Sequence, residues 1–108
     1  MIKKSSLFEK ILSVVAKIPK GKVTTYGGIG LFLGLKDARV VGWALHQNKD
    51  PIKCPCHRVV DKSGGLSKGY AFGGRNRQEE LLASEGILFK KDGNVDLNKH
   101  LWLPDIRK

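Results

Sequence analysis

The segment from Lys53 to Gly65, KCPCHRVVDKSGG, holds the residues of this chain best suited to covalent chemistry. In it Cys56 is followed directly by His57 and Arg58. A cysteine attacks only as the thiolate, so a nucleophilic role needs a base and an electropositive setting. An imidazole and a guanidinium can supply both, and one hypothesis is therefore that Cys56 is a nucleophile.

The same segment allows two other interpretations of Cys56. One is a zinc site, for which the chain offers four further ligands: Cys54, His46, His57 and His100. The C-x-C-H spacing departs from the pairs typical of zinc knuckles, and the chain has only these two cysteines, so we predict no metal. The other is a small buried thiol, the commonplace situation for a free cysteine.

A nucleophilic Cys56 also needs a suitably placed base. On an extended chain neighbouring side chains point to opposite sides. We therefore expect His57 to reach the sulfur through a bridging water. A carboxylate that holds the imidazole would complete the relay, with Glu79 and Glu85 as the candidates, and spacing alone does not choose between them.

The N-terminal part of the chain predicts an amphipathic helix. It is expected to begin at Ser6, where Glu9 completes a capping box, and to end at Pro19 and Gly21. Its apolar face follows helical spacing: Leu7, Phe8, Ile11, Leu12, Val15 and Ile18.

Two further short helices are predicted after this one. The first is capped by Thr25 and stops at Gly34, and the second is capped by Asp37. Short helices joined by a few residues indicate a helix-turn-helix.

In such a motif the second helix contacts DNA. Arg39 lies in its first turn, where the helix dipole disfavours a lone cation, so we expect this side chain to face phosphates or bases. The small residues Gly42 and Ala44 would let the helix approach a surface closely.

The second half of the chain is predicted to be rich in loops. A short strand is expected at residues 57–60 and a turn at residues 61–65. A helix follows, capped by Asn76 with Glu79 at the box position, and it stops at Gly86.

The C-terminal part offers a hairpin signal at Asp92 and Gly93. An apolar anchor follows: Leu101, Trp102 and Leu103. The whole pattern predicts one domain over residues 1–108, mainly α with a small β element.

Charge is the most informative feature of the composition. Twenty Lys+Arg against ten Asp+Glu give a formal net charge of +10. Such an excess is typical of a protein with a polyanionic partner, most simply nucleic acid, with a merely soluble basic protein as the alternative.

We also expect an intracellular protein without a membrane span, either cytoplasmic and nucleoid-associated or nuclear. No apolar run approaches the roughly 20 residues that a bilayer requires. Glu9, Lys10 and Lys17 interrupt the N-terminal apolar stretch, which does not suit a signal peptide. The two cysteines are too close for an unstrained disulfide and would stay reduced.

Five segments together resemble a known family. PCHRVV at 55–60 closely resembles the active-site motif of the methylated-DNA–protein-cysteine methyltransferases, or alkylguanine-DNA alkyltransferases. Four more segments look like blocks of that family, in family order: IPKGKVTTYG (18–27), ARVVGWAL (38–45), GYAFGG (69–74) and LLASEG (81–86). The resemblance covers most of the chain and implies a winged helix-turn-helix-like DNA-binding domain.

The resemblance implies a particular reaction. Cys56 would accept an alkyl group from the exocyclic oxygen of a damaged guanine, and the stable thioether would limit the protein to a single turnover. His57 would take the thiol proton through water, and Glu85 would polarise the imidazole. Asn48 matches the asparagine that braces the active-site turn, and Tyr70 would donate a hydrogen bond to the base. No cofactor is implied.

The DNA contacts are implied in the same way. Tyr26 resembles the tyrosine that rotates the damaged nucleotide out of the stack, and Arg39 the arginine that fills the space. Thr25 and Gly42 belong to the DNA-facing side, and backbone carbonyls around Val59 would recognise the exocyclic amine. The implied partners are double-stranded DNA, entered through the minor groove, and its alkylated guanine, with other repair proteins as further candidates and a monomer as the acting species.

Some features depart from the family pattern. Small size and the C-terminal sequence resemble the alkyltransferase-like proteins, which bind alkylguanine without transfer and recruit nucleotide excision repair. In those proteins tryptophan or alanine typically replaces the cysteine, so the presence of Cys56 favours transfer. Ala71 stands where some members have serine, and the loop near Gly73 and Gly74 is one residue longer than usual. We expect Cys54 to be a packing residue.

Overall fold

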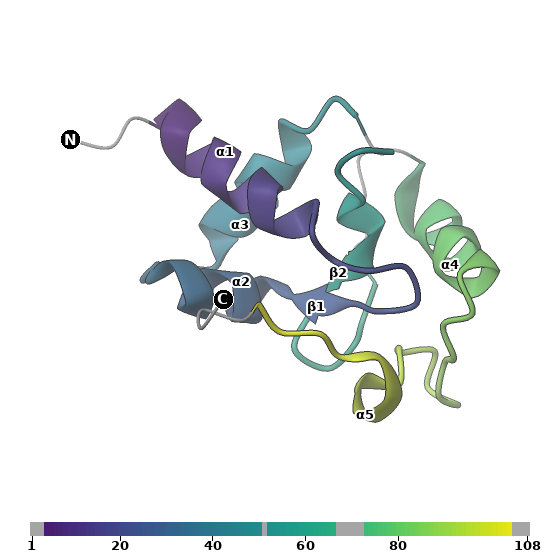
Figure 1. The fold of residues 1–108 in the computed structure, drawn as a ribbon. Helices are drawn as coiled ribbons and strands as arrows, with labels where there is room; N and C mark the ends of the chain where they lie inside the picture. The colour runs from purple at the N-terminus through teal and green to yellow at the C-terminus, as the bar shows by residue number, and fades with distance from the viewer. Residues whose placement is uncertain (1–3, 51, 67–72, 105–108) are drawn as a thin grey trace.

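The structure, a computed structural model, describes residues 4–50, 52–66 and 73–104. The elements in chain order are α1 (Lys4–Val15), β1 (Thr24–Thr25), α2 (Tyr26–Leu33), α3 (Arg39–His46), the 3₁₀ helix η1 (Cys56–Arg58), β2 (Val59–Val60), α4 (Gly74–Ser84) and α5 (Leu97–His100). Figure 1 shows α1, α2 and α3 grouped together, with α4 on the far side of η1 and β2. The prediction of a mainly helical chain with a small β element is confirmed.

The first helix is shifted toward the N-terminus relative to the prediction. It begins at Lys4, so the capping box predicted at Ser6 is wrong; adding residues to a nucleated helix costs little. It also ends at Val15, well before Pro19. The chain then tightens into bonds between residues three apart, such as Ile18 N–H to the Val15 carbonyl at 3.1 Å, because the residue before a proline disfavours the α conformation.

The predicted pair of short helices is present as α2 and α3, which pack against each other. The Thr25 hydroxyl caps α2 by accepting the Gly28 N–H at 2.9 Å, and Gly34 ends it with φ 71°, as expected. In α3 the N-cap is Ala38 rather than Asp37. The Asp37 carboxylate still accepts the Arg39 N–H at 2.9 Å, so it satisfies the helix end from one position further out.

The two-residue strands separate two hydrophobic cores. β1 and β2 pair in parallel, with Thr24 opposite Val59 and Thr25 opposite Val60. Adjacent side chains of a strand point to opposite faces. Val59 accordingly packs into the core formed by α1, α2 and α3, while Val60 packs into a second core with Leu82 of α4. The segment of η1 and β2 therefore lies where the two cores meet.

The predicted start of the helix in the second half of the chain needs correction. Helix α4 begins at Gly74, after a Gly73 with φ 125°, so Asn76 lies inside the helix and is not its cap. The helix end is close to the prediction: Ser84 is the last residue, Glu85 is the C-cap, and Gly86 follows with φ 85°.

The C-terminal apolar segment is only partly an anchor. Leu101 and Leu103 are exposed, whereas Trp102 packs against the first core. The segment runs beside Val23, whose carbonyl accepts the Trp102 N–H at 2.7 Å, and alternate side chains of such an extended chain face opposite ways. The predicted turn at Asp92 and Gly93 is present, with Gly93 at φ 87°.

Candidate active site

The turn that carries Cys56 is held by backbone geometry at a proline. Pro55 has φ −77° and ψ 72°, the conformation of an inverse γ-turn. The Cys56 N–H closes the turn by donating to the Cys54 carbonyl at 2.8 Å. Proline suits the central position because its ring fixes φ near this value and it has no N–H to satisfy. The chain thereby changes direction just before Cys56.

Asn48 braces this turn through hydrogen bonds of its side chain. It is buried beyond the end of α3, and its Nδ2 donates to the Cys54 carbonyl at 2.8 Å. Its Oδ1 accepts the Asp50 N–H at 3.0 Å. The end of α3 is therefore connected directly to the backbone two residues before Cys56.

The expectation that Cys56 and His57 lie on extended chain is wrong. Residues Cys56–Arg58 form η1, and the predicted strand is reduced to Val59–Val60. In a helix of about three residues per turn, adjacent side chains leave the axis about 120° apart instead of on opposite sides. The 3₁₀ conformation forms because the Arg58 N–H donates back to the Pro55 carbonyl, at 2.9 Å.

The structure chooses between the two carboxylates that the sequence offered. His57 Nε2 lies 3.0 Å from Glu85 Oε2, and both side chains are nearly buried. Glu79 is exposed on α4. Glu85 reaches His57 because it is the C-cap of α4, which packs against η1.

This contact defines the protonation pattern of the imidazole. An ionised carboxylate can only accept, so the Nε2 of His57 carries the hydrogen and donates it to Glu85. His57 Nδ1 is buried and has no hydrogen-bond partner among the residues that the structure describes. In the neutral ring this nitrogen is a proton acceptor, which is the state a general base needs.

Arg58 has a role that the sequence interpretation missed. Its guanidinium grips Glu85 with two bonds, Nε to Oε1 at 2.9 Å and Nη2 to Oε2 at 2.6 Å. A third bond runs from Nη1 to the Ile18 carbonyl at 2.7 Å. The positive charge expected to serve Cys56 is thus paired with Glu85. No sequence signal identified this pair, because the need of Glu85 for a cation follows from its burial, which only the structure shows.

Burial and charge act in opposite directions in this cluster. Burial lowers the pKa of His57 below its ordinary value, and the hydrogen bond to Glu85 offsets this only in part. Burial alone would raise the pKa of Glu85, but the hydrogen bonds from Arg58 and His57 outweigh it and hold that pKa low. The resting site therefore pairs a neutral imidazole with a charged carboxylate.

Gln78 is a second residue that sequence reasoning missed. This α4 side chain is 1% exposed, and its Nε2 donates to the His57 carbonyl at 3.0 Å and to the Val59 carbonyl at 3.2 Å. Both carbonyls lie in the segment that leads away from Cys56. A glutamine on a charged helix resembles a surface residue in sequence, so no local signal identified it.

The two cysteines are both buried, Cys56 at 4% exposure and Cys54 at 8%. Cys54 Sγ donates to the Leu12 carbonyl at 3.5 Å. Burial, with the neighbouring Cys56 and Asp50, raises the pKa of Cys54 to about 11. Cys54 is therefore a protonated packing residue, as expected from the sequence.

The histidines that could have joined a zinc site lie in different environments. His100 accepts the Leu88 N–H on Nε2 at 3.0 Å and donates from Nδ1 to the Gly21 carbonyl at 3.1 Å. Both of its ring nitrogens are therefore hydrogen-bonded to the backbone. His46 lies on α3. Across residues 4–50, 52–66 and 73–104, no three His, Cys, Asp or Glu side chains are grouped closely enough to hold a metal ion.

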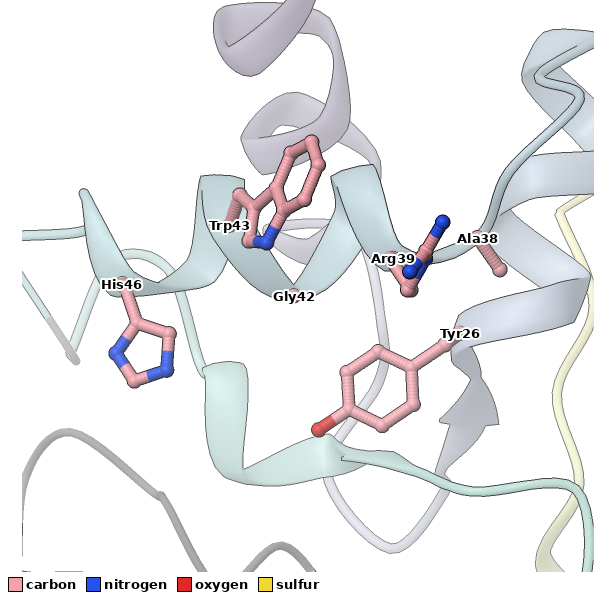
Figure 2. A pocket seen from close by; sticks show the side chains of 6 residues that line it. All are labelled: Tyr26, Ala38, Arg39, Gly42, Trp43 and His46. Atoms are coloured by element: carbon pink, nitrogen blue, oxygen red, sulfur yellow. The ribbon is translucent and has the colours of Figure 1, made fainter.

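A pocket of about 390 Å³ opens on the outer side of the helix-turn-helix. It is lined by Tyr26, Ala38, Arg39, Gly42, Trp43 and His46. Figure 2 shows Tyr26 projecting from the start of α2 beneath α3, with Gly42 and Trp43 between Arg39 and His46 along the helix. The pocket thus brings together Tyr26, Arg39 and Gly42, three residues predicted to contact DNA.

Two expectations about this helix are corrected. Arg39 is not a lone cation, because its guanidinium pairs with Asp37, with Nη2 2.7 Å from Oδ2. The Asp37 carboxylate supplies the negative charge that the helix N-terminus favours. Ala44 is fully buried against the first core, so only Gly42 of the two small residues lies on the outer face.

The remaining predicted site residues differ in how the structure uses them. The Thr25 hydroxyl is used as the cap of α2. Val59 is buried, and its carbonyl already accepts a hydrogen bond from Gln78. Tyr70 and Ala71 lie outside the described residues.

Together these features define a helix-turn-helix domain in which the residue after Cys56, His57, is hydrogen-bonded to Glu85. Residues 6–87 match the family described as "6-O-methylguanine DNA methyltransferase, DNA binding domain". The chain belongs to this family, and the predicted resemblance is confirmed.

Similar proteins carry two kinds of name. The chain is 34% identical over 103 residues to the DNA base-flipping protein of Escherichia coli, covering 94% of this chain and 78% of that one. It is also 34% identical over 99 residues to the methylated-DNA–protein-cysteine methyltransferase of Cricetulus griseus, covering 90% of this chain and 47% of that one. The crystal structure of Schizosaccharomyces pombe Atl1, in complex with damaged DNA containing O6-carboxymethylguanine, superposes with a TM-score of 0.80 at 31% identity, over 95% of this chain and all of the other.

These matches agree with a winged helix-turn-helix-like fold and with a family of DNA alkylguanine repair proteins. Within the described residues no helix is both long and apolar enough to cross a bilayer.

Proposed function

We propose that the protein repairs alkylated guanine in duplex DNA by transferring the alkyl group to Cys56. The observation that carries this proposal is the hydrogen bond between His57 Nε2 and Glu85 Oε2, made by a turn that also bears Cys56. A cysteine with a neutral, carboxylate-held imidazole in the same turn has the parts of an activated nucleophile.

The proposed reaction is a displacement at the alkyl carbon. The thiol proton of Cys56 passes through water to His57 Nδ1, and Glu85 stabilises the imidazolium that results. The thiolate forms a carbon–sulfur bond as the bond from that carbon to the guanine oxygen breaks, and its electron pair stays with guanine. The guanine takes up a proton as it leaves, which balances the proton lost by the thiol. We propose Tyr70 as the hydrogen-bond donor to the guanine. Since the thioether is stable, each molecule reacts once.

The damaged base must leave the duplex before this reaction, because Cys56 is buried in the core to which α3 contributes and the alkylated oxygen of guanine is enclosed in stacked DNA. We assign α3 to the minor groove, whose nearly sequence-independent pattern suits a protein that must recognise damage in any context. Tyr26 and Arg39, which share a pocket, promote extrusion and occupy the vacated space. Basic side chains, 20 Lys+Arg in all, provide the attraction to phosphates.

A second function is favoured by a specific observation. Cys56 is only 4% exposed, and a base-flipping protein is among the similar proteins. The alternative is a protein that binds the extruded alkylguanine, leaves the alkyl group in place and recruits other repair factors.

Intact-mass measurement after incubation with a duplex that contains methylated guanine separates the two functions. Transfer predicts that the protein gains the mass of one methyl group, with one equivalent of DNA repaired. The Cys56→Ser variant should gain nothing, and the Cys54→Ser variant, the matched control two residues away, should react like the wild type. Tight binding of the lesion duplex with no change in mass would overturn transfer and support the alternative.

A further inference from the structure

Trp43 is an exposed aromatic residue with no evident structural role. It is 55% exposed in the middle of α3, whereas Trp102 is packed against the first core. More than half of the surface of Trp43 therefore stays in water, where it adds nothing to the hydrophobic stabilisation of the fold. The packing of the domain therefore does not explain the exposed part of this side chain.

The neighbours of Trp43 indicate a binding surface. Arg39, Gly42, Trp43 and His46 recur at the spacing i, i+3, i+4 and i+7, which places them on one face of α3. The opposite face is buried, with Val41 and Ala44 at 0% exposure. The outer face is therefore free of the protein core, and it borders the pocket of about 390 Å³ seen in Figure 2.

The middle of this face is bare, which allows close approach. Gly42 has no side chain, and a Cβ built on it would meet nothing within 4 Å. Trp43 stands beside this opening and Arg39 is one turn away, with a side chain that is 80% exposed. A flat apolar group next to an accessible cation suits a ligand that is both aromatic and anionic.

We infer that Trp43 is an apolar contact for duplex DNA, packing its indole against the deoxyribose and base edges of intact pairs beside the extruded nucleotide. This rests on the proposed binding of α3 to the minor groove. Four residues of helix rise about 6 Å, close to two base-pair steps of about 3.4 Å. With Arg39 at the vacated position, Trp43 meets pairs that remain stacked. Aromatic and apolar contacts of this kind are independent of sequence.

Duplex DNA is the occupant that the charges favour. The chain carries a formal net charge of +10, and Arg39, which borders the pocket, has a side chain that is 80% exposed although it is paired with Asp37. A second copy of so basic a chain would be repelled at this face. The contact should form on undamaged DNA as well, because intact pairs are present with or without a lesion.

Tryptophan fluorescence gives a direct test, since the chain has two tryptophans and Trp102→Phe leaves Trp43 as the single emitter. Adding unmodified duplex to Trp102→Phe should quench the emission and reduce its sensitivity to acrylamide. Unchanged emission at a DNA concentration that saturates binding would overturn the inference. Quenching that grows with protein concentration in the absence of DNA would overturn it too, in favour of self-association.

Binding measurements on the full chain provide a second test of the Trp43 contact. Trp43→Ala should weaken binding roughly tenfold, the loss expected for one aromatic contact with a nucleotide, and by the same factor on unmodified and lesion duplexes. Trp43→Phe should restore most of the affinity. Leu88→Ala, the matched control at 52% exposure outside the pocket, should bind as the wild type does. A loss confined to lesion DNA, or no loss at all, would overturn the inference.

The result is separable from the proposed transfer reaction. Quenching of Trp43 by undamaged DNA without any methyl gain on Cys56 would support the contact and remove transfer. Methyl gain on Cys56 with no quenching of Trp43 would support transfer and overturn the Trp43 contact.

Discussion

A single carboxylate organises the chemistry at the scale of residues. Glu85 accepts bonds from both Arg58 and His57, so it fixes the imidazole while its own charge is balanced by the guanidinium. Partly buried charges of this kind are tolerated only when each is paired and hydrogen-bonded. The nitrogen left over, His57 Nδ1, is thereby held as an acceptor next to the turn of Cys56.

Gln78 provides a test of how firmly this turn is held. In Gln78→Glu an acceptor replaces the amide that donates to the His57 and Val59 carbonyls, so two buried carbonyls lose a donor and face a carboxylate. The free energy of unfolding should fall by roughly 3 kcal/mol, measured by urea denaturation. Glu79→Gln, an exposed change on the same helix, should leave stability within about 0.5 kcal/mol. Equal stability of Gln78→Glu and wild type would contradict the bracing role.

At the scale of elements, α3 has one face packed in the core and one outer face, for which we propose contact with DNA. Val41 and Ala44 are buried, while Arg39, Gly42 and Trp43 border the outer pocket. Asn48 just beyond its C-terminus is bonded to the backbone near Cys56. One helix is therefore connected to both the proposed DNA surface and the turn that bears Cys56.

The pair between Asp37 and Arg39 predicts a variant that binds DNA more tightly. The carboxylate holds the arginine and also repels phosphates. Asp37→Asn keeps an oxygen that can accept the Arg39 N–H, but it removes the charge. The affinity for duplex DNA should rise several-fold, most clearly at low salt, in a fluorescence anisotropy titration.

Two controls make this prediction specific. Asp92→Asn removes an equal charge from a distant exposed turn and should change affinity less. Asp37→Asn in an Arg39→Ala background should lose most of the gain. Weaker binding by Asp37→Asn alone would show that the ion pair positions Arg39 instead of restraining it.

At the scale of the whole molecule, the site lies where two hydrophobic cores meet. Val59 belongs to the core of α1, α2 and α3, and Val60 to the core beneath α4. Cys56 and Asn48 come from the first side, and Glu85 and Gln78 from the second. The cluster therefore exists only when both halves of the domain are folded against each other.

Stability should accordingly fall on acidification. The pKa of His57 is lowered in the folded protein, so below its ordinary value of 6.5 the unfolded chain binds a proton that the folded protein resists. The pKa of Glu85 is also lowered, so its contribution is complete above 4.5 and is lost as the pH falls further. Both groups act in the same direction.

The His57→Gln variant isolates the contribution of His57 to this pH dependence of stability. This variant can still donate to Glu85 but does not titrate. The difference in unfolding free energy between wild type and variant should therefore change between pH 6.5 and the lowered pKa of His57, and stay constant above pH 6.5. Thermal unfolding across that range measures it. A constant difference throughout would show that burial does not shift this histidine.

The sequence by itself determined what depends on local residues and short spacings. Thr25 and Gly34 bound α2 because a hydroxyl cap and a left-handed glycine act within a few positions. The segment PCHRVV, together with the other blocks in order, identified the family correctly. Glu85 was one of two candidate carboxylates for His57, and spacing could not separate it from Glu79.

Only the tertiary structure decided the rest. It selected Glu85, paired Arg58 with it, buried Gln78 against two carbonyls, and turned Cys56–Arg58 from the predicted strand into a 3₁₀ helix. The contacts of Glu85 and Gln78 join residues about 20 or more positions apart, and the 3₁₀ helix, although closed by a local bond from Arg58 to Pro55, has both Cys56 and His57 buried. The energy of a buried charge or polar group depends on which protein groups replace the water around it. Those groups come from distant parts of the folded chain, so the local sequence does not specify them.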